Sequence, residues 1–266
     1  MRFGLLMQVT GAQAMRFDYQ KMESARNFAN KIRNAARFVG MNLEGYVAGT
    51  PDPTTPADRW IFSRLAKLVA RLDGLYDEFE FGEITRDLYS FFWNEFCDWY
   101  IEFSKSRLTG DDAAERLACQ RNLMFVLDQA IRLLHPIMPF VTEEVAHQLG
   151  FLGENETILR AEYPTGYTDE EKKAWGLTDE VYEYVNAKRE MITAGRALRA
   201  EYKVNPAAFV KMVVQCRDAG IAAQLTTDLP YLKKALRAEE VEIVTDDSDR
   251  AMPGMLTKLG TIYLSL

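Results

Sequence analysis

Amide, cationic and aromatic side chains gather on one face of the helix predicted over residues 18–42. At about 100° per residue, four of them fall within about 60° of Asn27, and three arginines form a row beside them. The face consists of Asn27, Asn30, Lys31, Asn34 and Phe38, and the row of Arg26, Arg33 and Arg37. Amides can hydrogen-bond base edges, cations can neutralise phosphate, and a phenyl ring can stack on an unpaired base. The face is therefore a candidate nucleic-acid surface, and the alternative is a solvated helix face with Phe38 packed under a neighbour.

Cysteine and histidine offer little material for metal or triad chemistry. The three cysteines, Cys97, Cys119 and Cys216, form no CxxC pair, which predicts free and mostly buried thiols. The two histidines share no HExxH spacing, so we expect no metal site. His135 directly precedes a proline at a predicted helix end, which favours a structural role beside the terminal carbonyls. No Walker loop, GxGxxG or GxSxG motif occurs.

Aromatic residues recur at three- and four-residue steps between positions 89 and 103. Residues 73–102 carry nine acids against one base, a net charge of −8 that repels phosphate. The stripe is thus predicted to be core rather than a stacking platform. Three carboxylates within it, Glu95, Asp98 and Glu102, could form an acid–base pair or a metal cluster. Without a matched histidine we expect them to be solvated acids.

The overall charge conceals local basic islands. The chain of 266 residues has a net charge of −7, yet residues 19–39 carry +4 and residues 185–203 carry +3. Because a binding surface responds to the local field, these islands keep a nucleic-acid partner open. No window approaches the roughly 18 uncharged apolar residues of a membrane span, and no secretory signal is evident.

The predicted architecture is mainly α-helical, with a helical bundle over residues 1–204 and a small α+β subdomain over residues 205–266. The pattern at residues 1–10 lacks an N-cap, which suggests a helix continued from a longer chain. Thr55 is predicted to cap a helix that begins at Pro56. Further helices are expected at 83–107, 111–135, after 142, 178–202, 221–225 and 229–236, strands at 209–215, 241–244 and 261–266, and irregular structure at 150–177.

Several sequence blocks together resemble one protein family. The run ARNFANKIRNAARF at 25–38, followed by MNL at 41–43, closely resembles the anticodon-binding domain of bacterial valyl-tRNA synthetases. Other blocks follow in that family's order and cover nearly the whole chain: FGEI at 81–84, FWNEFCDWYIE at 92–102, LHPIMPFVTEE at 134–144, YP at 163–164 and RAEYKV at 199–204. The third of these blocks is shared with the leucyl and isoleucyl enzymes and discriminates less.

The resemblance implies tRNA(Val) as the partner of a cytoplasmic monomer, with no membrane and no metal partner. It places Lys31, Arg37 and Phe38 at positions that meet the anticodon. It makes Arg196, Arg199 and Lys203 weaker candidates for tRNA phosphates.

The family's HIGH and KMSKS signatures are absent. The resemblance therefore implies a segment that follows the catalytic domain and precedes a coiled coil. Such a segment would hold no cofactor of its own, with ATP and magnesium belonging to the parent ligase. Three alternatives stay open: a helical protein-interaction domain, an enzyme using the carboxylates near Glu95, and the equivalent leucyl or isoleucyl domain.

Overall fold

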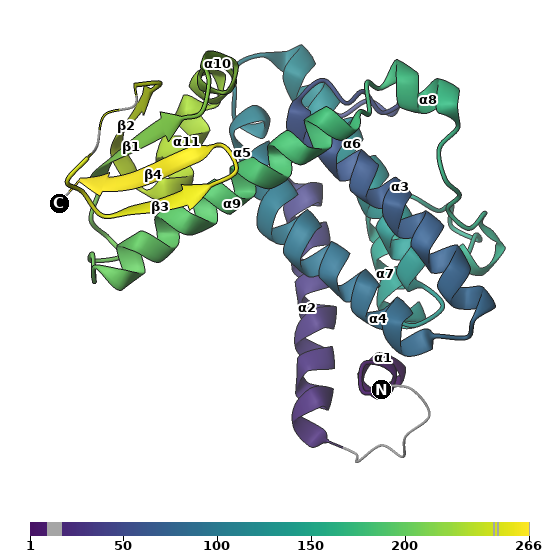
Figure 1. Ribbon diagram of the computed structural model, residues 1–266. Helices are drawn as coiled ribbons and strands as arrows, with labels where there is room; N and C mark the ends of the chain where they lie inside the picture. The colour runs from purple at the N-terminus through teal and green to yellow at the C-terminus, as the bar shows by residue number, and fades with distance from the viewer. Residues whose placement is uncertain (10–17, 247, 249, 266) are drawn as a thin grey trace. The chain divides into compact units, whose positions relative to one another are not determined.

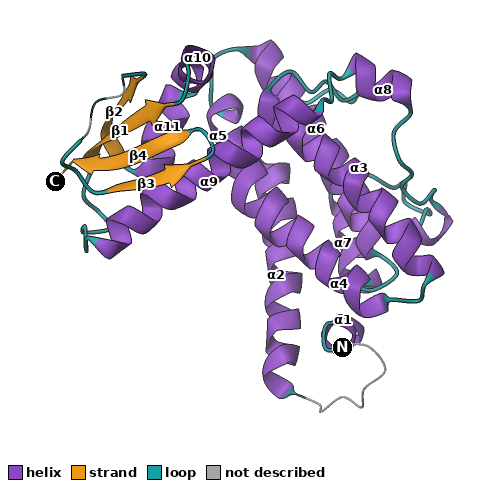
Figure 2. Cartoon of the chain, viewed as in Figure 1, coloured by secondary structure: helices purple, strands orange, loops and turns teal. Residues whose placement is uncertain are grey.

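The computed structural model describes residues 1–9, 18–246, 248 and 250–265. The chain divides into two compact units, Met1–Thr178 and Asp179–Leu266. Figure 1 labels the helices and strands of each unit, and Figure 2 shows that the strands belong to the second. Among the described residues, no helix is both long and apolar enough to cross a membrane.

The first unit is built from helices that follow one another along the chain. Helix α2 packs against α1, α6, α7 and η1, while α3 packs against α4, α6 and η1 (Figure 1). The helices of this unit are α1 (Arg2–Leu6), α2 (Tyr19–Met41), α3 (Pro56–Asp77), α4 (Phe81–Tyr89), the π-helix η1 (Ser90–Tyr100), α5 (Ile101–Leu108), α6 (Ala113–Leu134), α7 (Pro139–Gln148), the 3-10 turn η2 (Ile158–Arg160) and α8 (Asp169–Ala174).

Local capping chemistry fixes the helix starts that the sequence predicted. The Asp18 side chain accepts a hydrogen bond from the Gln20 backbone N–H at 2.8 Å and begins α2. Thr55 and Asp58 form a reciprocal capping box around Pro56, which confirms the predicted start of α3. The helix predicted for residues 1–10 is only partly described, since Thr10 lies outside the described residues.

The helix predicted over 83–107 is present, but its middle is a π-helix. Eleven residues of η1 lie between α4 and α5 without a break in the helical path. Four residues of the aromatic stripe, Phe92, Phe96, Tyr100 and Phe103, are core as predicted, whereas Tyr89, Trp93 and Trp99 are half-buried. Phe92, Phe96 and Tyr100 are completely buried, and Phe28 of α2 lies with its ring centroid 5.8 Å from that of Phe92.

A buried carboxylate joins four segments of the first unit. Asp58 is 0% exposed, and Arg107 of α5 donates to both of its oxygens at 2.9 Å. The Tyr100 hydroxyl donates to the same carboxylate at 2.6 Å. Burial, reinforced by Asp58, raises the pKa of the Tyr100 phenol well above its ordinary value, so the hydroxyl stays a donor. Arg107 also bonds Glu115 of α6 and the Thr54 hydroxyl, so one ion pair ties the start of α3 to η1, α5 and α6.

The second unit is a sheet covered by helices. Its strand order is β2-β1-β4-β3, with β1 parallel to β2 and antiparallel to β4. Helix α9 packs against β3, β4 and α11. The elements are α9 (Asp179–Glu201), β1 (Val210–Cys216), α10 (Ala219–Thr227), α11 (Leu229–Leu236), β2 (Ala238–Val244), β3 (Gly254–Thr257) and β4 (Gly260–Ser265).

Two sequence expectations differ from the structure here. The boundary predicted after residue 204 differs from the division into compact units at 178/179, because α9 packs against β3, β4 and α11 of the second unit. Strand β3 and the short helix α8 were not predicted, since four and six residues show too little periodicity. The three cysteines are free and buried, as expected.

His135 ends α6 in a neutral form that the surrounding hydrogen bonds define. Its Nδ1 lies 2.8 Å from the Thr142 hydroxyl, which itself donates to the carbonyl oxygen of Met138 or Pro139. The hydroxyl must therefore accept from Nδ1–H, which leaves Nε2 unprotonated. Nε2 is buried and has no hydrogen-bond partner among the described residues. Burial lowers the pKa of His135, and the nearby Glu143 offsets this only in part.

Removing the Asp58–Arg107 ion pair should strongly destabilise the first unit. Arg107→Met leaves a completely buried carboxylate without its cation, and we expect a loss of about 3–5 kcal/mol in urea unfolding. The matched control is Arg71→Met, because Arg71 pairs with Asp87 but is 57% exposed. The control should cost far less, because an ion pair this open to solvent contributes little to stability. Equal losses of unfolding free energy in the two variants would show that the buried Asp58–Arg107 pair does not stabilise the unit more than an exposed pair does.

Acid should weaken the fold through His135. The pKa of this group is lower in the folded chain than in the unfolded chain, where it is about 6.5. The unfolded state then binds the proton first, so the contribution is complete above the unfolded pKa and is lost progressively as pH falls from there through the lower folded pKa. Comparing urea midpoints at pH 8 and pH 5, we expect His135→Asn to lose less stability than the parent. His147→Asn, at an exposed position, should behave like the parent.

Candidate nucleic-acid interface

Helix α2 presents two opposite faces, as its sequence pattern predicts. Phe28 and Ile32 are completely buried in the bundle. The amides of Asn27, Asn30 and Asn34 are exposed on the other side. Because the apolar face anchors the helix in the bundle, the amide face is available for an incoming partner.

Two cations of this surface are already paired. Lys31 Nζ lies 2.8 Å from an Asp98 carboxylate oxygen and 4.8 Å from the ring centroid of Trp93. Arg33 forms a two-pronged bond with Glu144 of α7, with contacts of 2.7 and 3.0 Å to the same oxygen. The hydrogen bond and the charge of Glu144 raise the pKa of Arg33. Sequence reasoning missed both partners, since they stand 67 and 111 positions away.

Two further arginines differ in their surroundings. Arg26 is exposed and pairs with Glu23 one turn earlier, at 3.2 Å. Arg37 is exposed, and its guanidinium donates to the Asn34 amide oxygen at 3.1 Å. No carboxylate pairs with Arg37 in the part of the chain that the structure describes. Its charge is therefore less compensated than the charges of Arg26, Lys31 and Arg33.

Phe38 stands at the border of the face and is only partly exposed. The Lys105 ammonium lies 5.9 Å from its ring centroid and is itself paired with Glu102. The ring is therefore neither freely solvated nor completely packed under a neighbour. One part of the ring surface is covered and another is open to a stacking partner.

The carboxylates of η1 and α5 are ion-paired rather than simply solvated. Glu95 pairs with Arg64 at 2.8 Å, Asp98 with Lys31, and Glu102 with Lys105. Nothing in this arrangement frees a carboxylate for acid–base chemistry. The described residues also contain no group of three or more His, Cys, Asp or Glu side chains able to hold a metal ion.

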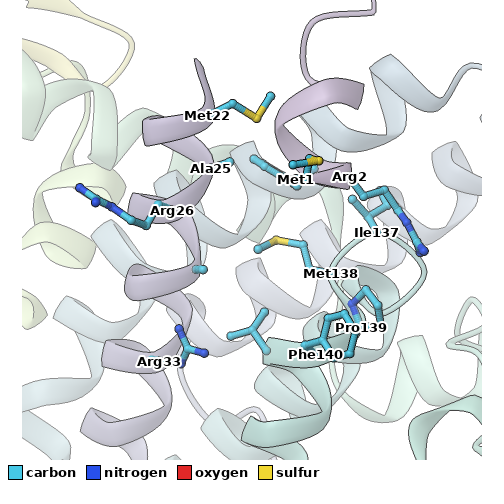
Figure 3. A pocket seen from close by; sticks show the side chains of 13 residues that line it. Met1, Arg2, Met22, Ala25, Arg26, Arg33, Ile137, Met138, Pro139 and Phe140 are labelled. Carbon is cyan, nitrogen blue, oxygen red and sulfur yellow. The ribbon is translucent and has the colours of Figure 1, made fainter. Parts of the chain in front are cut away.

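An apolar groove of about 670 Å³ runs beside the arginine row (Figure 3). Met22 and Ala25 of α2 line one side of it, and Met138 and the 90% exposed Phe140 line the other. Arg26 and Arg33 stand at its edge. The groove draws on three distant stretches of sequence, so no local pattern could have predicted it.

The remaining predicted residues belong to the second unit and form a separate set. Arg196 is exposed, and its Nε donates to the Ala235 carbonyl at 3.0 Å. Lys203 is exposed beyond the end of α9. Arg199, the third candidate for tRNA phosphates, is only 8% exposed. Its guanidinium bonds the carbonyl oxygens of Arg237, Asn205 and Ala208, so it orders the chain after α9.

Comparison with known proteins places the chain in one family. Residues 58–214 match the model of the anticodon-binding domain of tRNA ligase. The chain is similar to the valine–tRNA ligase of Enterococcus faecalis, at 41% identity over 250 residues, covering 92% of this chain and 28% of that protein. It is also similar to the valine–tRNA ligases of Lactiplantibacillus plantarum (40% identity, 89% of this chain, 26% of that protein) and Bacillus anthracis (38% identity, 97% and 29%).

The chain thus spans less than a third of the length of these relatives. The matched model begins inside α3 and continues into β1, so it takes in parts of both units. Helix α2 lies before the matched residues. On the strength of the family model, which covers more than half of it, this chain belongs to the family of tRNA ligase anticodon-binding domains.

Proposed function

We propose that this chain binds the anticodon region of tRNA(Val) as part of a valine–tRNA ligase, and that it does so as a monomer in the cytoplasm. The observation that carries the proposal is the exposed face of α2. There three amides, Arg37 and the open side of Phe38 lie together on a helix whose other face is completely buried. The similarity to valine–tRNA ligases supports the choice of tRNA.

Each group on this face suits one part of an anticodon loop. Amides offer both a donor and an acceptor to a base edge, and Arg37 offers a charge to phosphate. The open side of Phe38 suits a base that has left the stack. Single-stranded loops are the part of RNA that proteins read in this way.

The paired cations can join this surface by exchanging partners. The Lys31–Asp98 and Arg33–Glu144 pairs have side chains between 29% and 51% exposed. Ion pairs of this exposure contribute only about 0–1 kcal/mol, so an approaching phosphate can replace the carboxylate at small cost. Arg37 needs no such exchange and is the first contact we assign.

Ligase activity would depend on ATP and magnesium bound elsewhere in a longer protein. The described residues offer no carboxylate cluster that fits a metal ion, and the sequence has no nucleotide-binding motif. The role we propose for this chain is to hold the tRNA, and it includes no chemical step.

Binding should depend on salt although the chain is acidic. We expect the logarithm of tRNA(Val) affinity to fall linearly with the logarithm of salt concentration, by about 0.7 per single-strand phosphate contact. Filter binding of Arg37→Gln should give a weaker affinity and a shallower slope. Arg71→Gln is the control, because Arg71 sits beside Asp87 and Glu83, where phosphate is disfavoured. Identical behaviour of both variants and the parent would remove Arg37 from the interface.

Substitutions on the two faces of α2 should affect different properties, stability for the buried face and tRNA binding for the exposed face. Phe38→Ala should weaken tRNA binding by about 1–3 kcal/mol because base stacking is removed, with a small effect on Tm. Ile32→Ala opens a cavity in the core and should cost about 2–5 kcal/mol of stability. Its affinity should be retained at temperatures where it is folded. Both Tm and affinity are measured for each variant at fixed salt. Unchanged affinity in Phe38→Ala would contradict the stacking role.

A further inference from the structure

Basic and aromatic side chains gather where α9 and α11 end and β1 and β2 begin. We call this group the C-terminal patch and define it as Arg199, Tyr202, Lys203, Phe209 and Arg237. The Arg199 guanidinium joins its parts, because it bonds the carbonyl oxygens of Ala208 and Arg237 at 2.8 and 3.1 Å. Phe209 directly follows Ala208, and Tyr202 and Lys203 follow the last turn of α9.

The cations of the patch lack negative partners. Arg199 is almost completely buried, and all three of its bonds go to neutral carbonyls. Arg237 donates to the Pro206 carbonyl oxygen. Across the described ranges, no carboxylate forms an ion pair with Arg199, Lys203 or Arg237. Buried charges are normally paired, so this site holds positive charge that an anion would neutralise.

Two of these cations occupy backbone positions that favour glycine. Lys203 has φ +53° and Arg237 has φ +49°, and each ends a helix in the left-handed conformation. At Lys203, the Val204 N–H donates to the Arg199 carbonyl oxygen and the Lys203 N–H donates to the Ala200 carbonyl oxygen. These two backbone bonds form the helix C-cap in which glycine usually occupies the left-handed position. A cation near a helix C-terminus complements the helix dipole, which explains why these side chains are positively charged. The dipole does not explain why a long side chain, rather than glycine, occupies the left-handed position in both Lys203 and Arg237.

Two aromatic rings beside these cations are open to solvent. Phe209 is 65% exposed and Tyr202 is 45% exposed. Exposed rings next to unpaired cations match the pattern of single-stranded nucleic-acid sites, where bases stack and phosphates are neutralised. An acidic peptide would use the cations but would leave the rings without a partner.

We propose that the C-terminal patch is a second RNA-binding site, which takes the phosphate backbone and an unstacked base of the same tRNA at a place other than the anticodon. The inference rests on the proposed function, since it assumes that tRNA is the partner. Lys203 and Arg237 contact phosphate, Phe209 or Tyr202 stacks on a base, and Arg199 positions the segments that carry them.

The test replaces the cations by the residue that their backbone prefers. In the full chain, Lys203→Gly with Arg237→Gly removes two charges and relieves two left-handed positions. Lys203→Gly alone is made as well, because Arg237→Gly also removes the bond to Pro206. The charge-matched control is Lys172→Gln with Lys258→Gln, two exposed lysines, of which Lys258 lies at the β3–β4 turn, at the other end of β1 from the patch.

We expect both glycine variants to keep their Tm while tRNA(Val) affinity falls several-fold. The salt slope should become shallower by about 0.7 for each phosphate that the variant no longer neutralises. The control should match the parent. Ultraviolet crosslinking of the parent to tRNA(Val) should also label the peptide that contains Tyr202 and Phe209.

Two outcomes distinguish a failure of the second RNA-binding site from a failure of the proposed function. If Arg37→Gln weakens binding but the glycine variants bind like the parent and no crosslink appears at residues 202–209, the second site is wrong and the proposed function stands. If the parent itself fails to bind tRNA(Val), the proposed function falls and this inference falls with it.

Discussion

The helical unit depends on the buried ion pair between Asp58 and Arg107, which connects α3, η1, α5 and α6. A carboxylate with no exposed surface is unstable unless it is paired and fully hydrogen-bonded, and this one has Arg107, Tyr100 and the Thr55 cap around it. Because Asp58 also belongs to the capping box of α3, the group that begins one helix fixes the position of η1 and α5. The aromatic core against which α2 packs lies on η1, so the placement of α2 follows from the same ion pair.

The π-helical geometry of η1 has an electrostatic consequence for α2. It places aromatic rings in the core and the Asp98 carboxylate beside Lys31. An acidic segment thereby lies against a basic helix, and it holds the helix through the Lys31–Asp98 ion pair as well as apolar contacts. The local field of the α2 face is consequently weaker than its count of cations indicates, and Arg37 contributes more to it than the paired Lys31 and Arg33.

Local sequence patterns predicted the structural features that depend on residues close together in the chain. The spacing of Phe28, Ile32 and Val39 is enough to identify the buried face of α2, and Thr55 with Pro56 is enough to place the start of α3. Interactions between distant residues were out of reach. Nothing near Arg33 points to Glu144, and nothing in the RAEYKV block shows that Arg199 is buried among carbonyls. The same limit explains the difference in the boundary, because the apolar face of α9 does not reveal whether a sheet or a bundle covers it.

The paired cations have a bearing on selectivity. A surface of free lysines and arginines binds any polyanion, because phosphate neutralisation carries no sequence information. On α2, Lys31 and Arg33 are already paired with carboxylates. A phosphate that replaces a carboxylate therefore gains only the difference in free energy between the two ion pairs. Under the proposed function, non-specific RNA would bind weakly, while a loop that also offers base edges to the amides and a base to Phe38 would bind through contacts that depend on its shape. Under the proposed function, a surface that pairs Lys31 and Arg33 with carboxylates is suited to that kind of discrimination, because repulsion from the acidic segments of the chain disfavours any nucleic acid that does not fit.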